Sequence, residues 1–95
     1  MTNVELHTHL CEELNALYEA KNHDYGNSFE KAYDEFGLTA CAVRIADKYN
    51  RFIELSKGTK AKVKDESIRD TLRDMANYCL MTIMILDKEK EKNGC

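Results

Sequence analysis

The chain has 95 residues, of which 43% are hydrophobic and 33% charged, and its formal net charge at pH 7 is −3. This length predicts one small domain, and a chain this short buries a limited share of its surface, which favours oligomerisation. The composition is typical of a soluble globular protein and excludes a disordered one. The net negative charge argues against a broad surface that binds nucleic acids or anionic membranes. It is compatible with a local cluster of basic residues that binds one small anion.

The cysteine pattern and the length of the apolar runs indicate the cellular compartment in which we expect the protein. Four cysteines stand far apart, without the CxxC or Cys/His spacing of a metal site. We therefore expect reduced, mostly buried thiols in a cytoplasmic protein. No apolar run reaches the roughly 18 residues of a membrane span, and no signal peptide is visible.

The absence of proline and the scarcity of alternating apolar and polar residues predict an all-α fold, a small helical bundle completed by oligomerisation. Gly37 is expected to end the second helix, and Thr39 and Asp65 are expected to cap the third and fourth. Within a single all-α domain over residues 1–95, we expect helices over about 4–23, 28–36, 39–56 and 65–88, with a charged tail over 87–95.

The third helix is expected to turn its apolar residues toward the core. These are Ala42, Ile45, Ala46, Tyr49, Phe52 and Ile53. Arg44, Asp47 and Arg51 lie along another side, where ion pairs on a solvated face are the simpler interpretation.

The first helix has an apolar stripe of Leu6, Leu10, Leu14 and Leu17, with Tyr18 beside them. Lys21 and Asp24 continue this stripe, so they point toward the bundle interior unless Lys21 only lays its stem along the core edge.

The fourth helix has two different sides. At about 100° per residue, one stripe roughly 80° wide carries three carboxylates and an amide, Glu66, Asp70, Asp74 and Asn77. The opposite side carries Ile68, Leu72, Met75, Cys79 and Ile83. From Cys79 to Leu86 the helix is apolar nearly all round, which predicts burial in a core or in a subunit interface.

Neighbouring helices of an antiparallel bundle pack side by side, so the polar sides of the third and fourth helices can face each other. Carboxylates gathered there would repel one another unless a cation lay among them. Oxygen ligands without His or Cys suit Mg²⁺ or Mn²⁺. The predicted metal ligands are Asp47, Glu66, Asp70 and Asp74, and the predicted substrate-binding residues are Lys21, Asp24, Arg44, Arg51 and Asn77.

Three segments carry a family resemblance: KNHDYGNSF, IADKYNRFIEL and DESIRDTLRDMANYCLM. Together they resemble the nucleotide modification associated domain, type 1, a small, largely phage-borne family of uncertain activity, over roughly residues 10–86. More distantly, the arrangement is similar to the MazG-like all-α nucleoside triphosphate pyrophosphohydrolases. Those enzymes hold Mg²⁺ between two acidic helices, cleave between the α- and β-phosphates, and work as dimers or tetramers.

The MazG-like pattern has ExxE on one helix and ExxD on the next. Asp47 matches the second acid of the first pair, while Arg44 stands at the first position. On the later helix, Asp74 matches and Asp70 lies one residue too far away, with Glu66 adding an acid one turn earlier.

The resemblance implies a Mg²⁺-dependent (deoxy)nucleoside triphosphate pyrophosphohydrolase that serves nucleotide-pool control or phage DNA base modification. Asp47, Asp70 and Asp74 would be catalytic, and the apolar end of the last helix would join a homodimer or homotetramer. Because Arg44 replaces a ligand acid, a non-catalytic helical module that binds a nucleotide or a partner protein is the alternative. A scaffold whose acidic stripe faces solvent is a third interpretation.

Overall fold

A computed structural model describes residues 1–25, 27–58 and 61–93, with the backbone alone for residues 23–25 and 61–66. It contains α1 (Asn3–Tyr25), α2 (Ser28–Phe36), α3 (Leu38–Ser56) and α4 (Ala61–Lys92), and no strand occurs in these ranges. The all-α prediction is confirmed. None of the helices in the described ranges is long and apolar enough to span a membrane.

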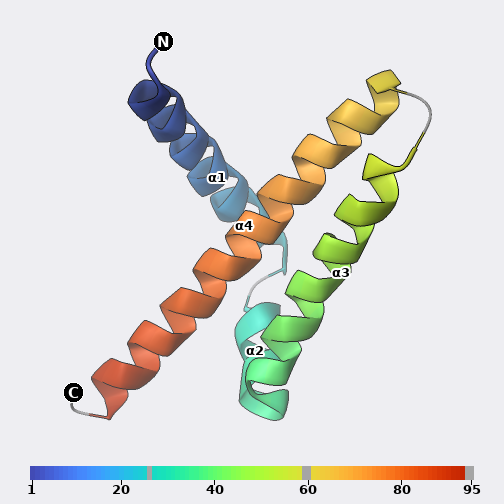
Figure 1. Ribbon diagram of the computed structural model, residues 1–95. Coiled ribbons are helices and arrows are strands. Elements are labelled where there is room, and N and C mark those ends of the chain that lie inside the picture. Colours follow the sequence, from blue (N-terminus) through green and yellow to red (C-terminus); the bar gives the residue numbers. More distant parts are fainter. Residues whose placement is uncertain (26, 59–60, 94–95) are drawn as a thin grey trace.

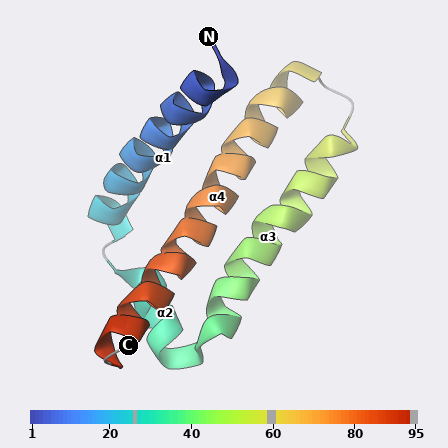
Figure 2. The ribbon, with the colours of Figure 1, turned by 60° about the vertical axis from the view of Figure 1, so that its left-hand side comes forward.

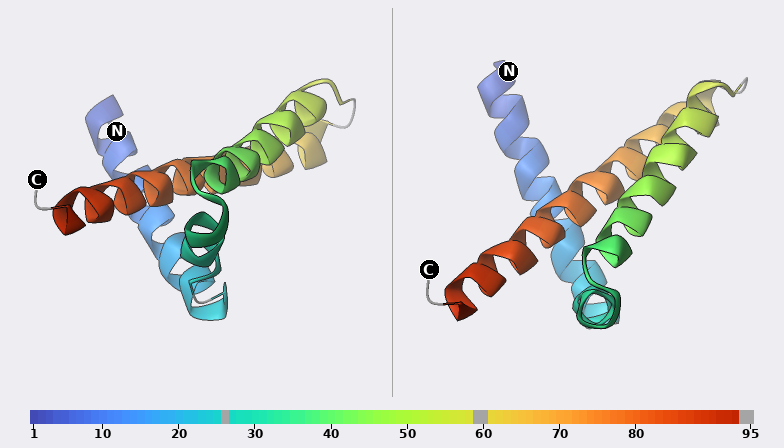
Figure 3. Two further views of the ribbon diagram at one scale, coloured as in Figure 1. Left: turned by 90° about the horizontal axis from the view of Figure 1, so that it is seen from below. Right: turned by 60° about the horizontal axis from the view of Figure 1, so that its bottom comes forward.

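Two of the helices, α3 and α4, form a layer, and α1 and α2 pack against it. α3 and α4 lie side by side and antiparallel, and they pack more extensively than any other pair (Figure 1). α1 crosses α4, which lies between α1 and α3 in the view of Figure 2. Seen from below, α2 and the C-terminal end of α1 lie on one side of the α3–α4 layer (Figure 3).

The helix ends confirm one predicted stop and correct two predicted caps. Gly37, between α2 and α3, has a φ of 71°, in the left-handed region that favours glycine, and its N–H donates to the carbonyl of Tyr33 at 2.6 Å. α3 begins at Leu38 with Gly37 before it and no side-chain cap, so Thr39 is not the cap. α4 begins at Ala61, so Asp65 lies inside the helix, because the preceding Ala-Lys-Val-Lys segment is itself compatible with a helix.

The single chain has a small core. Among the described residues, the buried apolar side chains are Cys41 and Ile85. The predicted core side of α3 is wrong in part, because Ala42, Ala46 and Tyr49 are exposed. The radius of gyration is 15.4 Å, whereas a compact chain of this length has about 12 Å.

Polar contacts hold α1 against α4. Glu13 accepts a bidentate pair of hydrogen bonds from Arg69, at 2.7 and 2.8 Å, and another from Arg73 at 2.7 Å. Asn77 donates from Nδ2 to the carbonyl of Leu14 at 3.1 Å. Leu6, at the start of the predicted apolar stripe of α1, is exposed. The docking of α1 therefore depends on charge as well as on apolar packing.

This arrangement predicts that Glu13 stabilises the fold in a pH-dependent way. The hydrogen bonds from Arg69, followed by the charges of Arg69 and Arg73, lower the pKa of Glu13 from 4.5 to about 2. A lowered carboxyl pKa gives stability that is present above the unfolded-state pKa and is lost as the pH falls through the folded-state pKa. Glu13→Gln should therefore lower the melting temperature by a few degrees at neutral pH, and the difference from wild type should shrink between pH 4.5 and 2.

Circular dichroism melts over this pH range measure the difference. Glu12→Gln, an exposed neighbour on α1, is the matched control and should follow the wild type throughout. A Glu13→Gln deficit that stays constant down to pH 2 would contradict the assignment.

Candidate functional site

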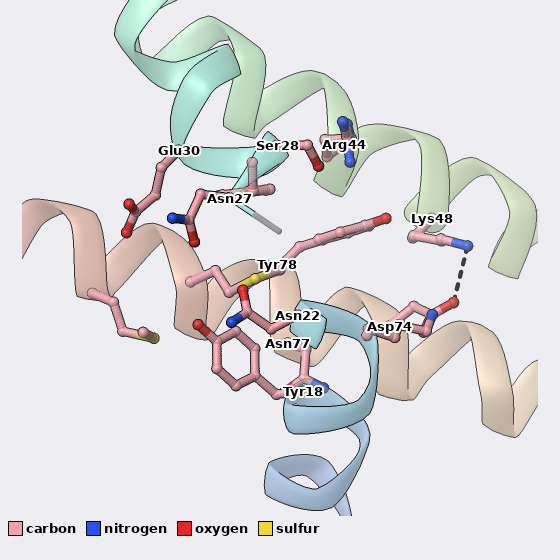
Figure 4. A pocket seen from close by; sticks show the side chains of 14 residues that line it. Tyr18, Asn22, Asn27, Ser28, Glu30, Arg44, Lys48, Asp74, Asn77 and Tyr78 are labelled. Carbon is pink, nitrogen blue, oxygen red and sulfur yellow. Dashed lines mark hydrogen bonds and ion pairs between the residues drawn. The ribbon is translucent and has the colours of Figure 1, made fainter. Parts of the chain in front are cut away.

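One pocket of about 430 Å³ lies where the α3–α4 layer meets the C-terminal end of α1 and the start of α2 (Figure 4). All four helices contribute to its wall. Its lining residues are Tyr18, Lys21, Asn22, Asn27, Ser28, Phe29, Glu30, Arg44, Lys48, Asp74, Asn77, Tyr78, Met81 and Met84.

Asp74 is the charged centre of the pocket. Lys21 from α1 contacts its Oδ1 at 2.8 Å and Lys48 from α3 contacts its Oδ2 at 3.1 Å. The Asp74 side chain is 18% exposed. Partial burial raises the pKa of Asp74, but the hydrogen bonds and charges of the two lysines outweigh it and hold the pKa below its ordinary value. Asp74 is therefore ionised at neutral pH and joins three helices at one point.

An aromatic pair with a cation above it forms another part of the wall. The rings of Phe29 and Tyr78 stack with centroids 5.7 Å apart and an interplanar angle of 9°. The guanidinium of Arg44 lies 6.0 Å from the Phe29 centroid and 5.9 Å from the Tyr78 centroid. Cation–π attraction and stacking keep all three groups in place, so Arg44 is a positioned positive charge at the pocket.

Amide side chains occupy a further part of the lining. Asn77 is buried and uses its amide group to hold the backbone of α1. Asn22 and Tyr18 project from α1 near it, and Asn27 and Glu30 lie at the end of the pocket away from Lys48 (Figure 4). Glu30 accepts a hydrogen bond from Lys88 at 2.7 Å.

The combined wall suits an anion that carries a flat ring. Lys21, Arg44 and Lys48 supply positive charge, against the carboxylates of Asp74 and Glu30. Charge-assisted hydrogen bonds from such groups are the strong contacts to phosphate or carboxylate. The aromatic pair and the amides offer stacking and hydrogen bonding beside them.

The structure brings together part of the predicted substrate-binding set. Lys21, Arg44 and Asn77 all line the pocket together with Asp74. Arg51 is exposed and does not line it. The side chain of Asp24 lies outside the described part of the chain.

The predicted metal ligands take different positions. Asp47 is exposed and does not line the pocket, and Asp70 is exposed and pairs with Arg73 at 2.8 Å. Among the described side chains, no group of three or more His, Cys, Asp or Glu residues is placed to hold a metal ion. Because the Glu66 side chain lies outside that part, the magnesium site stays a prediction.

Lys48 lines the pocket but is not among the site residues predicted from the sequence. This residue lies four positions after Arg44 and seven after the buried Cys41, on the inner side of α3. That spacing was a usable signal, because a basic residue on the same side as an apolar one faces the interior. Phe29 and Tyr78 come from different helices, so no local sequence pattern predicts that their rings stack.

The nucleotide modification associated domain 1 family matches residues 21–86. The chain belongs to this family. The matched span includes every lining residue except Tyr18, so the pocket is built almost entirely within the nucleotide modification associated domain. Neither the curated proteins nor the solved structures give a match.

The ion pairs of Asp74 predict that Asp74→Asn destabilises this nucleotide modification associated domain. The variant loses the charge that holds Lys21 and Lys48 together and leaves two cations side by side. Since the lysines are partly exposed, the expected loss of unfolding free energy is about 1 to 2 kcal/mol.

Urea denaturation followed by circular dichroism measures this loss. Asp70→Asn, which removes an exposed i,i+3 pair on the same helix, is the matched control and should cost less than about 0.5 kcal/mol. Equal losses in the two variants would contradict the central position of Asp74.

Proposed function

We propose that this domain binds a (deoxy)nucleotide in the pocket, with its phosphates at Lys21, Lys48 and Arg44. The observation that carries the proposal is the placement of these cations beside the Phe29–Tyr78 pair in one pocket. A nucleotide has the matching parts, an anionic chain at one end and an aromatic base at the other. The volume of about 430 Å³ falls in the range of small-molecule sites, roughly 300 to 1,000 Å³.

The phosphate end of the proposed complex follows from the ion pairs of Asp74. Lys21 and Lys48 are already oriented into the pocket by one carboxylate, so a phosphate group replaces one anionic partner with another. Arg44 adds a guanidinium, which binds phosphate oxygens in a fixed fork. In this exchange at least one lysine turns from Asp74 to the phosphates, while the other keeps the Asp74 carboxylate paired.

The base end of the proposed complex follows from the aromatic pair and the amides. Tyr78 lies in the pocket wall, and Asn22 and Asn27 offer both donors and acceptors (Figure 4). Such groups hold a base by stacking and by hydrogen bonds to its edge. The family name, which refers to nucleotide modification, supports a nucleotide over other anions with a flat ring.

Mg²⁺-dependent hydrolysis of a (deoxy)nucleoside triphosphate to a monophosphate and pyrophosphate is a second candidate. One observation favours it: Asp74, the acid that matches the MazG-like pattern, lines the pocket beside the lysines. In this proposal Asp47, Glu66 and Asp70 are the further ligands of Mg²⁺, and the domain acts in nucleotide-pool control or base modification. The described side chains of one chain do not form that ligand set, so binding is the function that the geometry supports best.

The binding proposal predicts that basic residues of the pocket are needed for affinity. In EDTA, isothermal titration with a panel of (deoxy)nucleoside mono- and triphosphates should find at least one that binds. Arg44→Met and Lys48→Met should each weaken its binding about tenfold or more, because a charge-assisted contact is lost. Lys31→Met, an exposed lysine on α2, should bind like the wild type. Affinities that are unchanged in both pocket variants would remove the proposal.

The hydrolysis candidate predicts Mg²⁺-dependent release of pyrophosphate. With a nucleotide that binds, Asp74→Asn and Asp47→Asn should lower the rate at least a hundredfold, while Glu12→Gln should retain it. A coupled pyrophosphate assay with and without Mg²⁺ measures the rate. If every triphosphate that binds stays intact in Mg²⁺ or Mn²⁺, the hydrolase candidate is wrong and the binding module remains.

A further inference from the structure

The pocket has a carboxylate at the end opposite its cations. Glu30, the third residue of α2, lines this end together with Asn27. The ion pair of Lys48 with Asp74 lies at the other end (Figure 4). A nucleotide that is bound with its phosphates at the cations therefore turns the part of itself furthest from the phosphates toward Glu30.

The order of the lining residues along α4 gives the pocket the same direction. Asp74, with its two lysines, comes first, Tyr78 follows one turn later, and Met84 lies furthest along the helix. At 1.5 Å per residue, Asp74 and Met84 are about 15 Å apart along the helix axis. Lys88, one turn beyond Met84, is the residue that bonds Glu30. Cations, aromatic ring and carboxylate thus follow one another along one helix.

Glu30 is held in position from outside this pocket. Lys88 donates to its Oε1 at 2.7 Å, and Lys88 lines a separate hollow between α2 and the C-terminal part of α4. Glu30 lines both the pocket and this hollow, and its side chain is 39% exposed. A carboxylate has about four lone-pair positions on its two oxygens. One bond from Lys88 therefore leaves Glu30 able to accept hydrogen bonds from a ligand.

The chemistry of a carboxylate restricts what can lie against it. An ionised carboxylate accepts hydrogen bonds and donates none. The base edge that pairs in a duplex points away from the sugar and the phosphates, so this edge reaches Glu30. Guanine, adenine and cytosine carry an amino group there, whereas thymine and uracil carry one N–H between two carbonyl oxygens, which a carboxylate repels. Asn27, at the same end, has an amide that can donate to the acceptor beside the amino group.

On the basis of the nucleotide site proposed for this pocket, we infer that Glu30 selects bases with an exocyclic amino group, guanine, adenine or cytosine, over thymine and uracil. In the bound state the amino group donates to Glu30, the ring lies against Tyr78 and the phosphates lie at Lys21 and Lys48. The cationic end of the pocket holds any nucleotide, and the Glu30 end decides which bases are accepted.

Isothermal titration of the full chain in EDTA, with the deoxynucleoside monophosphates of the five bases, tests this selection. At least one nucleotide with an amino-bearing base should bind about tenfold or more tightly than those of thymine and uracil, which is the discrimination that a good contact to a base edge gives. Glu30→Met, which removes the acceptor and keeps the length of the side chain, should reduce the difference to about threefold or less.

Lys88→Met is the matched control, because Glu30→Met also breaks the bond between α2 and α4. The control breaks the same bond but leaves the carboxylate at the pocket, so it should keep the preference of the wild type. A preference that is lost equally in both variants would assign the effect to the contact between the helices and overturn the selection by Glu30.

Equal affinities of the wild type for all five nucleotides, or a preference that survives in Glu30→Met, would also overturn the selection. In these cases nucleotides still bind, so the proposed nucleotide site stands. If neither the monophosphates nor the corresponding triphosphates bind to the wild type, the nucleotide site itself is wrong, and the selection falls with it.

Discussion

The ion pairs of Asp74 with Lys21 and Lys48 are the constraint on which the site depends. They join α1, α3 and α4 at one place, next to a pocket that α2 helps to close. Burial of a lone carboxylate would raise its pKa and favour the neutral acid, but two lysines keep Asp74 ionised. The same contact therefore fixes the crossing of the helices and leaves two oriented cations at the pocket wall.

This arrangement gives the pocket its chemical character. A cation that is already held in position loses little conformational freedom when an anionic ligand replaces its partner. Arg44, fixed above the stacked rings of Phe29 and Tyr78, adds charge beside an aromatic wall. The chain belongs to the nucleotide modification associated domain 1 family, and the ligand proposed for it combines phosphates with a base.

The sequence predicted the all-α fold and the stop at Gly37. It also placed Asp74 and Asn77 on one stripe of the last helix, and Lys21 on a continuation of the apolar stripe of the first. These features depend on periodicity and turn chemistry, which are local. Which side of a helix is covered by other helices depends on contacts between residues that are far apart in the sequence. Asp70 shares the stripe of Asp74 but lies one turn beyond the pocket and is exposed. Likewise, the sequence predicted that Ala42, Ala46 and Tyr49 face the core, and that the apolar end of α4 is buried in a core or in a subunit interface. In one chain Ala42, Ala46, Tyr49 and Ile83 are exposed, because a pattern of apolar residues does not specify what covers them.

The proposed ligand site lies where the α3–α4 layer meets the C-terminal end of α1 and the start of α2. A crystal structure with a bound nucleotide would show which side chains hold the ligand. The prediction is that phosphate oxygens lie within hydrogen-bond distance of Lys48 Nζ, that the base lies against Tyr78, and that at least one lysine has moved from Asp74 to the phosphates. A nucleotide bound away from this pocket, with both lysines still on Asp74, would contradict it.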